Sequence, residues 1–154
     1  MILLRNQIGD FCRDLKAQNK KIVFTNGCFD ILHLGHVTYL KQARALGDFL
    51  FVGLNSDSSV KKLKGENRPI QTEKDRAEIL SSLKSVDAVS IFEEETPLTL
   101  IKKIWPDVLV KGGDWPIDKI IGSKEVIEAG GKVLSLPFVE GHSSSDLIDK
   151  LKKL

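Results

Sequence analysis

The sequence predicts a single α/β domain, residues 1–154, in which a parallel sheet of five strands carries helices on both faces. Two observations predict this fold. From Lys21 onward, short apolar runs alternate with amphipathic segments of helix length, an order that favours right-handed crossovers and a parallel sheet. The runs are continuous rather than alternating, as in strands buried on both faces. Neither an internal repeat nor a linker interrupts the pattern.

The predicted strands cover residues 21–25, 49–54, 87–92, 107–111 and 132–136. Between them, apolar residues at three-residue steps predict helices over 37–46 and 77–83. Gly47 follows the first of these helices, where a left-handed C-terminal residue is common. Sheets of this kind bind ligands at the carboxyl ends of their strands.

Two further helices are expected at the ends of the chain. Residues 1–20 predict an N-terminal helical extension with one apolar face: Ile8, Phe11, Cys12 and Leu15. A last helix follows the serines at 143–145, and we expect its apolar positions to face inward: Leu147, Ile148 and Leu151.

Composition excludes several classes of protein. The chain has 42% apolar and 29% charged residues and a formal charge of only +2, without the clustered basic face of a nucleic-acid-binding protein. No apolar run approaches the roughly 18–20 residues that span a bilayer, and the N-terminus reaches charge too early for a secretory signal. Cys12 and Cys28 lack CxxC spacing. We therefore expect a cytoplasmic protein with reduced thiols.

The first strand runs into TNGCFDILHLGH, residues 25–36. This segment is neither a GxGxxG fingerprint nor a P-loop. His33 and His36 lie at a predicted helix start, three residues apart, so their rings can point the same way. Helix starts attract phosphate through free N–H groups and about half a positive charge. The pattern indicates a polyphosphate site, at which Gly27 and Gly35 would let a ligand approach closely.

Two other interpretations of these histidines stay open. A single histidine near a helix start is usually structural or simply exposed. His33 and His36 together with Cys28 or Asp30 are also competent metal ligands, although no fourth ligand at a suitable spacing is evident.

GCFDILHLGH resembles the HxGH signature of the cytidylyltransferase-like nucleotidyltransferases. From about Lys21 to Lys150 the chain is similar to their heptose 1-phosphate adenylyltransferases, through blocks that include VGLNSDSSVKKLKGENRP, VKGGDW, IGSKEVIEAGGKV and EGHSSSDLI. The resemblance implies a Rossmann-like sheet and transfer of AMP from ATP to D-glycero-β-D-manno-heptose 1-phosphate. In many bacteria this activity is half of a bifunctional kinase–adenylyltransferase; this chain resembles the stand-alone form. His142 departs from the Cys or Ile that relatives often carry.

The resemblance also implies roles for individual residues. His33, His36 and Lys64 would act on the triphosphate, and Mg²⁺ would accompany ATP, held largely by phosphates and water. The implied nucleotide-binding residues are Asn26, Gly27, Cys28, Phe29, Asp30, Gly35, Lys111, Gly112, Asp114, Ser143, Ser144 and Ser145. The implied acceptor-binding residues are Arg68, Arg76 and Lys84.

Several of these positions have a structural alternative. Lys61 and Lys62 are interpreted as exposed helix surface, whereas Lys64 would be a mobile loop cation. Arg76 could equally form a salt bridge near Asp75 or Glu78. Trp115 is assigned to the core, because large aromatic side chains mostly pack. One of the three serines is expected to cap the last helix.

Two other functions compete with adenylyl transfer. A cytidylyltransferase acting on glycerol 3-phosphate would share the HxGH motif and a late Ser/Thr block. A nucleotide-sensing module would bind without reacting. The expected partners are ATP and a sugar phosphate, with no nucleic acid and no membrane, and a homodimer is a reasonable expectation for the superfamily.

Overall fold

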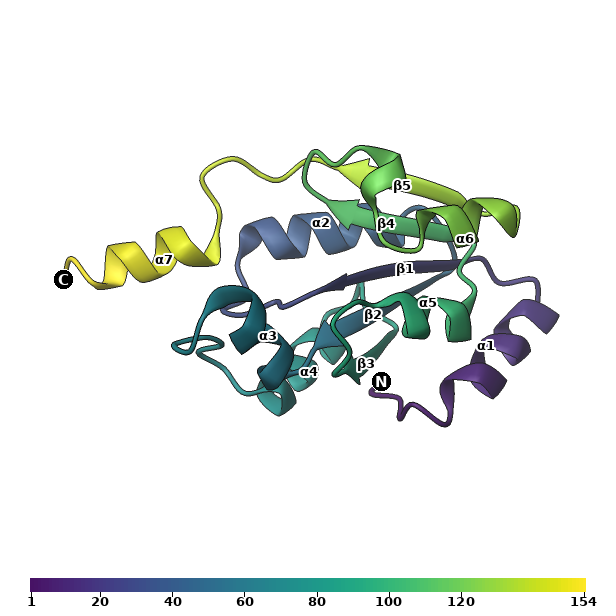
Figure 1. Cartoon of the computed structure of the whole chain (residues 1–154), viewed down its shortest axis with the longest axis horizontal. Coiled ribbons are helices and arrows are strands. Elements are labelled where there is room, and N and C mark those ends of the chain that lie inside the picture. Colours follow the sequence, from purple (N-terminus) through teal and green to yellow (C-terminus); the bar gives the residue numbers. More distant parts are fainter.

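A single parallel sheet organises the computed structural model, which describes all 154 residues (Figure 1). Its strand order is β3-β2-β1-β4-β5, and every neighbouring pair is parallel. The predicted five-stranded Rossmann-like α/β fold is therefore confirmed. The strands are β1 (Ile22–Gly27), β2 (Phe49–Asn55), β3 (Ala88–Phe92), β4 (Val108–Gly112) and β5 (Lys132–Leu136).

Helices cover both faces of this sheet, as predicted. Because side chains alternate along β1, Val23 and Phe24 enter two different apolar cores. The core around Phe24 is closed by α1 (Ile8–Ala17), α5 (Leu98–Ile104) and α6 (Ser123–Glu128). The core around Val23 is closed by α2 (Leu34–Arg44) and α4 (Glu73–Ser81). The remaining helices are α3 (Asp57–Lys64), the short 3₁₀ helix η1 (Ile117–Lys119) and α7 (Ser144–Leu151).

The N-terminal segment is built into this body. Ile8 and Cys12 of α1 are fully buried in the core around Phe24. Before the helix, Leu3 donates its backbone N–H to the carbonyl of Val89, and Ile2 forms a parallel bridge with the same residue of β3. The first residues thus cover part of an otherwise open sheet edge.

Three local predictions are wrong. Gly47 does not adopt a left-handed conformation; a Cβ there would lie 2.7 Å from the carbonyl oxygen of Lys21, so the glycine serves a close approach to β1. The segment with Lys64 is the helix α3 rather than a loop, capped by Ser56. Leu151 of α7 is 64% exposed, because α7 extends away from the sheet (Figure 1).

The order of the strands reverses next to β1. The chain moves from β1 to β2 and β3 on one side, and then places β4 and β5 on the other. A crevice forms at the carboxyl ends of the strands at such a switch point. None of the helices has the length and apolar character needed to cross a membrane.

Candidate active site

The crevice opens because β1 and β4 separate. β1 pairs with β2 along its whole length, but with β4 only at Val23 and Phe24. Where that pairing stops, the Tyr39 hydroxyl from α2 bridges the gap through hydrogen bonds with Thr25 and the carbonyl of Val110. Burial raises the pKa of Tyr39 to about 12, so the hydroxyl remains a neutral donor at the floor of the crevice.

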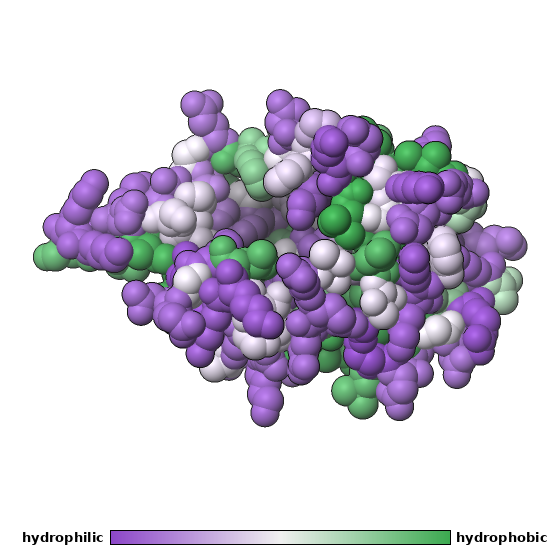
Figure 2. Space-filling model, viewed as in Figure 1, coloured by the Kyte–Doolittle hydropathy of each residue, from purple (hydrophilic) through white to green (hydrophobic).

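A cavity of about 560 Å³ lies above this floor. Its walls are the ends of β1 and β4, the start of α2, the end of α3 and the segment 138–146 that leads into α7. Figure 2 shows the surface hollowed here, between the tip of the sheet and α7, with mainly hydrophilic side chains around the opening. The size suits a nucleotide-like ligand.

His33 and His36 form a stacked pair in this cavity. Their ring centroids lie 3.9 Å apart with an interplanar angle of 27°, and the Phe29 ring packs edge-on against His36 at 5.3 Å. His33 is the N-cap of α2, and its Nδ1 accepts a hydrogen bond from the Gly35 N–H at 3.1 Å. In the neutral ring this leaves the proton on Nε2, where it can be donated to a ligand.

Both imidazoles are held neutral without a ligand. Burial, followed by the charges of His33 and Lys64, lowers the pKa of His36 to about 4. Burial, followed by the charge of His142, also lowers the pKa of His33. His36 Nδ1 is buried and has no hydrogen-bond partner. An anion in the cavity would reverse the repulsion and favour protonated rings.

Asp30 organises the loop after β1. Its carboxylate accepts hydrogen bonds from Arg68 Nε and from the N–H groups of Ile70 and Gln71, at 2.8 to 3.0 Å. Burial would raise the pKa of Asp30, but these donors outweigh it and hold that pKa below its ordinary value. The Asp30 carbonyl accepts a hydrogen bond from Ser144. Phe29 and Ile31, on either side of Asp30, have positive φ values of 46° and 55°. The contacts of Asp30 hold this unusual backbone conformation in place.

Two lysines supply positive charge to the cavity wall. Lys64 is the last residue of α3 and Lys111 is the next-to-last residue of β4, and both line the cavity. Burial lowers the pKa of Lys111. Burial also raises the pKa of the Cys28 thiol, although nearby cations, Lys64 first, oppose this. Lys61 and Lys62 are exposed on α3, as expected.

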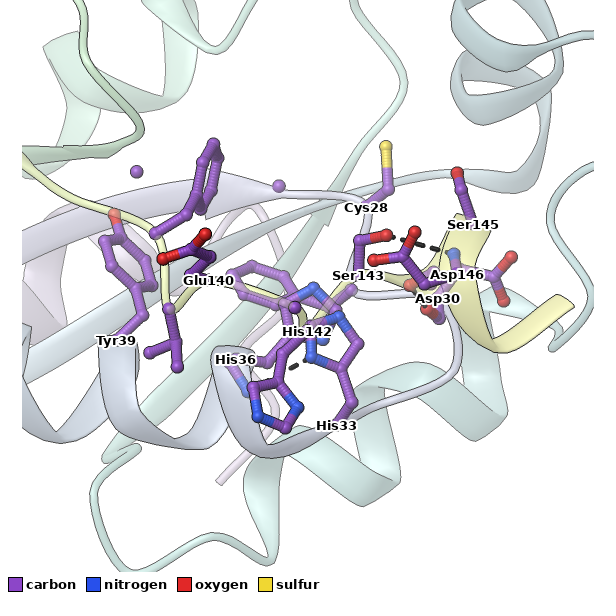
Figure 3. A pocket seen from close by; sticks show the side chains of 18 of the residues that line it. Cys28, Asp30, His33, His36, Tyr39, Glu140, His142, Ser143, Ser145 and Asp146 are labelled. Carbon is purple, nitrogen blue, oxygen red and sulfur yellow. Dashed lines mark hydrogen bonds between the residues drawn. The ribbon is translucent and has the colours of Figure 1, made fainter. Parts of the chain in front are cut away.

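The serine block joins the cavity to α7. Ser143 caps the helix, and its Oγ accepts a hydrogen bond from the Asp146 N–H at 3.0 Å (Figure 3). The expectation that one serine is an N-cap is thereby confirmed. Ser144 is buried and Ser145 is exposed, and both line the cavity. The free N–H groups of a second helix start thus face the same space as α2.

The space beside the motif glycines is filled by the protein itself. A Cβ at Gly27 would lie 3.0 Å from the ring of Phe29, and one at Gly35 would lie 2.9 Å from the ring of His33. Both glycines therefore leave room for these two rings. Both also line the cavity, and a close approach of ligand to them stays a prediction.

All three residues assigned to catalysis line the cavity, as does every predicted nucleotide-binding residue except Asp114. The acceptor residues are not brought together. Arg76 is buried. Its guanidinium donates hydrogen bonds to the Asp57 carboxylate and to three backbone carbonyls, and it does not pair with Asp75 or Glu78. Lys84 lies in a shallow groove at the amino ends of the strands, opposite the cavity, because it precedes β3. Arg68 is held beside the cavity by Asp30, and its Nη2 is buried without a partner.

Sequence reasoning misassigned Trp115 and missed other wall residues. Trp115 is 48% exposed and lines the cavity, so the expected core position is wrong; Asp114 beside it is exposed outside the cavity. Tyr39 follows His36 by one helical turn, a spacing that could have indicated a shared face. The other missed residues precede or begin α7: Phe138, Val139, Glu140, Gly141, His142 and Asp146.

No three His, Cys, Asp or Glu side chains lie close enough together to hold a metal ion. His33, His36 and Cys28 or Asp30 therefore do not form the alternative metal site. Of the cavity carboxylates, that of Asp30 is committed to its three donors, whereas those of Glu140 and Asp146 make no ion pair.

Several known proteins are similar to this chain in sequence and in fold. Residues 24–150 match the family model described as cytidylyltransferase-like. The "Bifunctional protein HldE" of Geobacter sulfurreducens is 51% identical over 138 residues, 90% of this chain and 28% of that protein. The protein of the same name from Wolinella succinogenes is 52% identical over 151 residues, 98% of this chain and 31% of that protein. The chain thus spans less than a third of the length of these two relatives.

A solved structure agrees with these matches. The lipopolysaccharide core biosynthesis protein of Thermoplasma volcanium superposes with a TM-score of 0.63 at 30% identity, covering 80% of this chain and 99% of that one. The switch-point crevice, the histidine pair and these matches define a nucleotidyltransferase. More narrowly, the chain belongs to the cytidylyltransferase-like family, whose model matches most of its length.

Proposed function

We propose that this chain transfers AMP from ATP to D-glycero-β-D-manno-heptose 1-phosphate, giving ADP-heptose and pyrophosphate. The observation that carries the proposal is the stacked pair of His33 and His36 at the start of α2, aimed into a cavity at the switch point of the sheet. The choice of a heptose acceptor is supported by the motif blocks of the sequence and by the 51–52% identity to two proteins named HldE.

The reaction needs no side-chain nucleophile, because the acceptor already carries a phosphate. An oxygen of that phosphate attacks the α-phosphorus of ATP in line, and the bond from this phosphorus to the bridging oxygen of the β-phosphate breaks. The leaving pyrophosphate keeps that oxygen and its electron pair. Catalysis of this kind is mainly alignment and charge stabilisation.

The cavity wall supplies what such a reaction requires. His33 and His36 would donate hydrogen bonds to the α- and β-phosphates, while Lys64 would balance charge on the leaving group. The start of α7 with Ser143–Ser145 would hold the terminal phosphates. The nucleoside would lie toward Gly112, where Trp115 borders the cavity. Arg68, held by Asp30, is the remaining candidate for the acceptor phosphate.

Mg²⁺ fits this site as a companion of the triphosphate. Its preferred ligands are oxygens, and it commonly keeps several waters. Glu140 and Asp146 are the uncommitted carboxylates of the wall and would hold the ion, directly or through water. When bound, it would neutralise part of the triphosphate charge. We expect the reaction in the cytoplasm, where ATP is available, and a homodimer, which sedimentation velocity would test.

The test is a pyrophosphate-release screen that crosses ATP and CTP with four acceptors: both anomers of the heptose 1-phosphate, glucose 1-phosphate and glycerol 3-phosphate. We expect the fastest release from ATP with the β-anomer, with ADP-heptose identified by mass spectrometry. The His36→Asn variant should lose about 100- to 1,000-fold in rate. Lys84→Ala, at the amino ends of the strands and away from the cavity, is the matched control and should react normally.

Other outcomes would point to the competing functions. Preferred use of CTP with glycerol 3-phosphate would replace the proposal with a cytidylyltransferase. Nucleotide binding without pyrophosphate release from any pair would favour a sensing module. Normal turnover by His36→Asn would contradict the proposed role of the histidine pair.

A further inference from the structure

Two aromatic rings border the cavity without being buried. Trp115 follows the end of β4, and Phe138 follows the end of β5. Both line the cavity, although 48% of Trp115 and 73% of Phe138 are exposed. Aromatic surface left in water forgoes the stabilisation that burial would give. Two such rings in one cavity wall therefore indicate a surface that is kept open for a ligand.

Both rings approach the backbone of Gly113. A Cβ at this glycine would lie 2.8 Å from Cε2 of Phe138 and 3.1 Å from Nε1 of Trp115. A Cβ at Gly112 would lie 3.1 Å from Cε1 of Phe138. Since neither position carries a side chain, the two rings can come close to the same short piece of backbone at the end of β4.

Ser135 fixes the turn that carries Trp115. Its Oγ donates a hydrogen bond to the carbonyl of Gly113 and accepts one from the Trp115 N–H at 3.1 Å. The Gly113 N–H donates to the carbonyl of Leu136 at 2.8 Å. The Lys111 ammonium, which also lines the cavity, lies 5.9 Å from the centroid of the Trp115 ring. The backbone of Trp115 is thus held by β5, while its ring stays at the cavity wall.

The two rings lie away from the serine block. Figure 3 shows Tyr39 on one side of the cavity and Ser143 and Ser145 on the other. Phe138 belongs to the Tyr39 side, because a Cβ at Gly112 would lie 3.1 Å from the Phe138 ring and 3.4 Å from the Tyr39 ring. A triphosphate whose end is held by the serines would therefore direct its nucleoside toward the aromatic rings.

We propose that Phe138 and Trp115 form an aromatic platform on which the base of the nucleotide stacks, and that this platform selects a purine over a pyrimidine. Stacking of a base on an aromatic side chain typically raises affinity by about 5- to 150-fold. A purine has two fused rings and covers more of the platform than the single ring of a pyrimidine. The inference rests on the proposed function in that the nucleotide must bind in this cavity, but it does not depend on the sugar acceptor.

Tryptophan fluorescence tests the stacking directly, because the chain has only two tryptophans. Trp105 follows α5 and precedes β4, so it lies at the amino ends of the strands, away from the cavity. Trp105→Phe therefore leaves Trp115 as the single indole. Without an acceptor, ATP should quench the Trp115 emission, CTP should quench it less, and inorganic tripolyphosphate, which has neither base nor sugar, should leave it unchanged. Unchanged emission with bound ATP would overturn the inference.

Calorimetric titration of four variants separates stacking from damage to the cavity wall. Phe138→Leu and Trp115→Leu keep an apolar side chain without an aromatic face, and each should bind ATP about tenfold more weakly than the wild type. Phe138→Tyr and Trp115→Phe keep a ring and should bind ATP nearly normally. All four should keep the wild-type affinity for tripolyphosphate; an equal loss for both ligands would mean that the rings only support the wall, and would overturn the inference.

The same titrations measure the choice of base. We expect the wild type to prefer ATP over CTP by about fivefold or more, and this ratio to approach one in the two leucine variants. An unchanged ratio in both leucine variants would contradict the selection of a purine by the platform.

The outcomes also separate this inference from the proposed function. If both leucine variants form ADP-heptose with the wild-type KM for ATP, the inference is overturned and the function stands. If ATP does not bind to the wild type, both are overturned. If ATP quenches Trp115 and the leucine variants weaken its binding, but no heptose product appears in the acceptor screen, the inference holds and the proposed acceptor is wrong.

Discussion

The hydroxyl group of Tyr39 lies 2.6 Å from Oγ1 of Thr25, at the point where β1 and β4 stop pairing. The same hydroxyl donates to the carbonyl oxygen of Val110 at 3.3 Å. One helix residue thereby closes the floor of the cavity, using a strand group on each side of the gap. Both hydroxyl-bearing residues are buried, so neither can exchange its partner for water.

Tyr39→Phe should therefore lower the free energy of unfolding by about 1–3 kcal/mol, since it leaves the Thr25 hydroxyl and the Val110 carbonyl without a partner. Thr25→Val should have a similar cost. The double variant should lose less than the sum of the two, because removing both hydroxyls leaves only the carbonyl unpaired. Urea denaturation of all four proteins measures the cycle; strictly additive losses would contradict the bridge.

Arg76 is expected to act on stability rather than on the acceptor. Its guanidinium donates to the carbonyls of Cys28, Asn55 and Gln71 at 2.6 to 3.1 Å and to the carboxylate of Asp57 at 2.7 Å. These contacts join the ends of β1 and β2 to α3 and α4. Arg76→Met should cost about 3–5 kcal/mol of unfolding free energy, because it leaves several buried acceptors unpaired.

The matched control is Lys84→Ala, which removes another cation assigned to the acceptor and should change stability by less than about 0.5 kcal/mol. Thermal denaturation compares the two variants with the wild type. If Arg76→Met proved as stable as the wild type but had a raised KM for the sugar phosphate alone, Arg76 would belong to the acceptor site after all.

The sequence predicted the sheet well because its strands are buried on both faces. The run 49–54 has no polar residue and the run 107–111 has three successive apolar residues at its centre, and each predicted range lies within two residues of the observed strand. The same logic placed His33 and His36 correctly, since a motif that follows a buried parallel strand must lie at its carboxyl end.

The rest depended on contacts between distant segments. The partners of Arg76 are mostly backbone carbonyls, which leave no trace in the sequence. The helix α3 buries few residues, Val60 among them, so it lacks an apolar period that could distinguish it from a loop. His142 precedes its helix in an irregular segment, which is held at the site by packing on Gly35 and by the hydrogen bond from Ser144 to Asp30.

Two glycines should respond in opposite directions to the same change. A Cβ at Gly47 would lie 2.7 Å from the carbonyl oxygen of Lys21 and 2.7 Å from a methyl group of Val23. Gly47→Ala should thus destabilise the protein by about 1–3 kcal/mol through overpacking. At Gly9 in α1 no atom lies within 4 Å, so Gly9→Ala should stabilise by about 0.5–1 kcal/mol through helix propensity.

Differential scanning calorimetry measures both glycine variants under one condition. A loss of stability at Gly9 equal to that at Gly47 would show that backbone freedom, rather than the approach of α2 to β1, decides the effect.

His36 should make the stability of the ligand-free protein fall on mild acidification. Burial, followed by the charges of His33 and Lys64, lowers the pKa of His36 to about 4, against an ordinary value of 6.5. Between these two values the unfolded chain binds more protons than the folded one, so stability must rise with pH. From pH 7.5 to pH 5.0 the wild type should lose about 2 kcal/mol through this group. The lowered pKa of His33 acts in the same direction.

His36→Asn removes this contribution, so its unfolding free energy should change much less between the two pH values. Urea denaturation at pH 7.5 and pH 5.0 gives the difference for each protein. The depressed pKa of Asp30 does not interfere, because that carboxylate titrates below its ordinary value of 3.8, under this window. Saturating tripolyphosphate should flatten or reverse the wild-type slope, since an anion favours protonated rings. If the unfolding free energy fell equally in the wild type and in the variant, groups other than His36 would cause the loss of stability in acid.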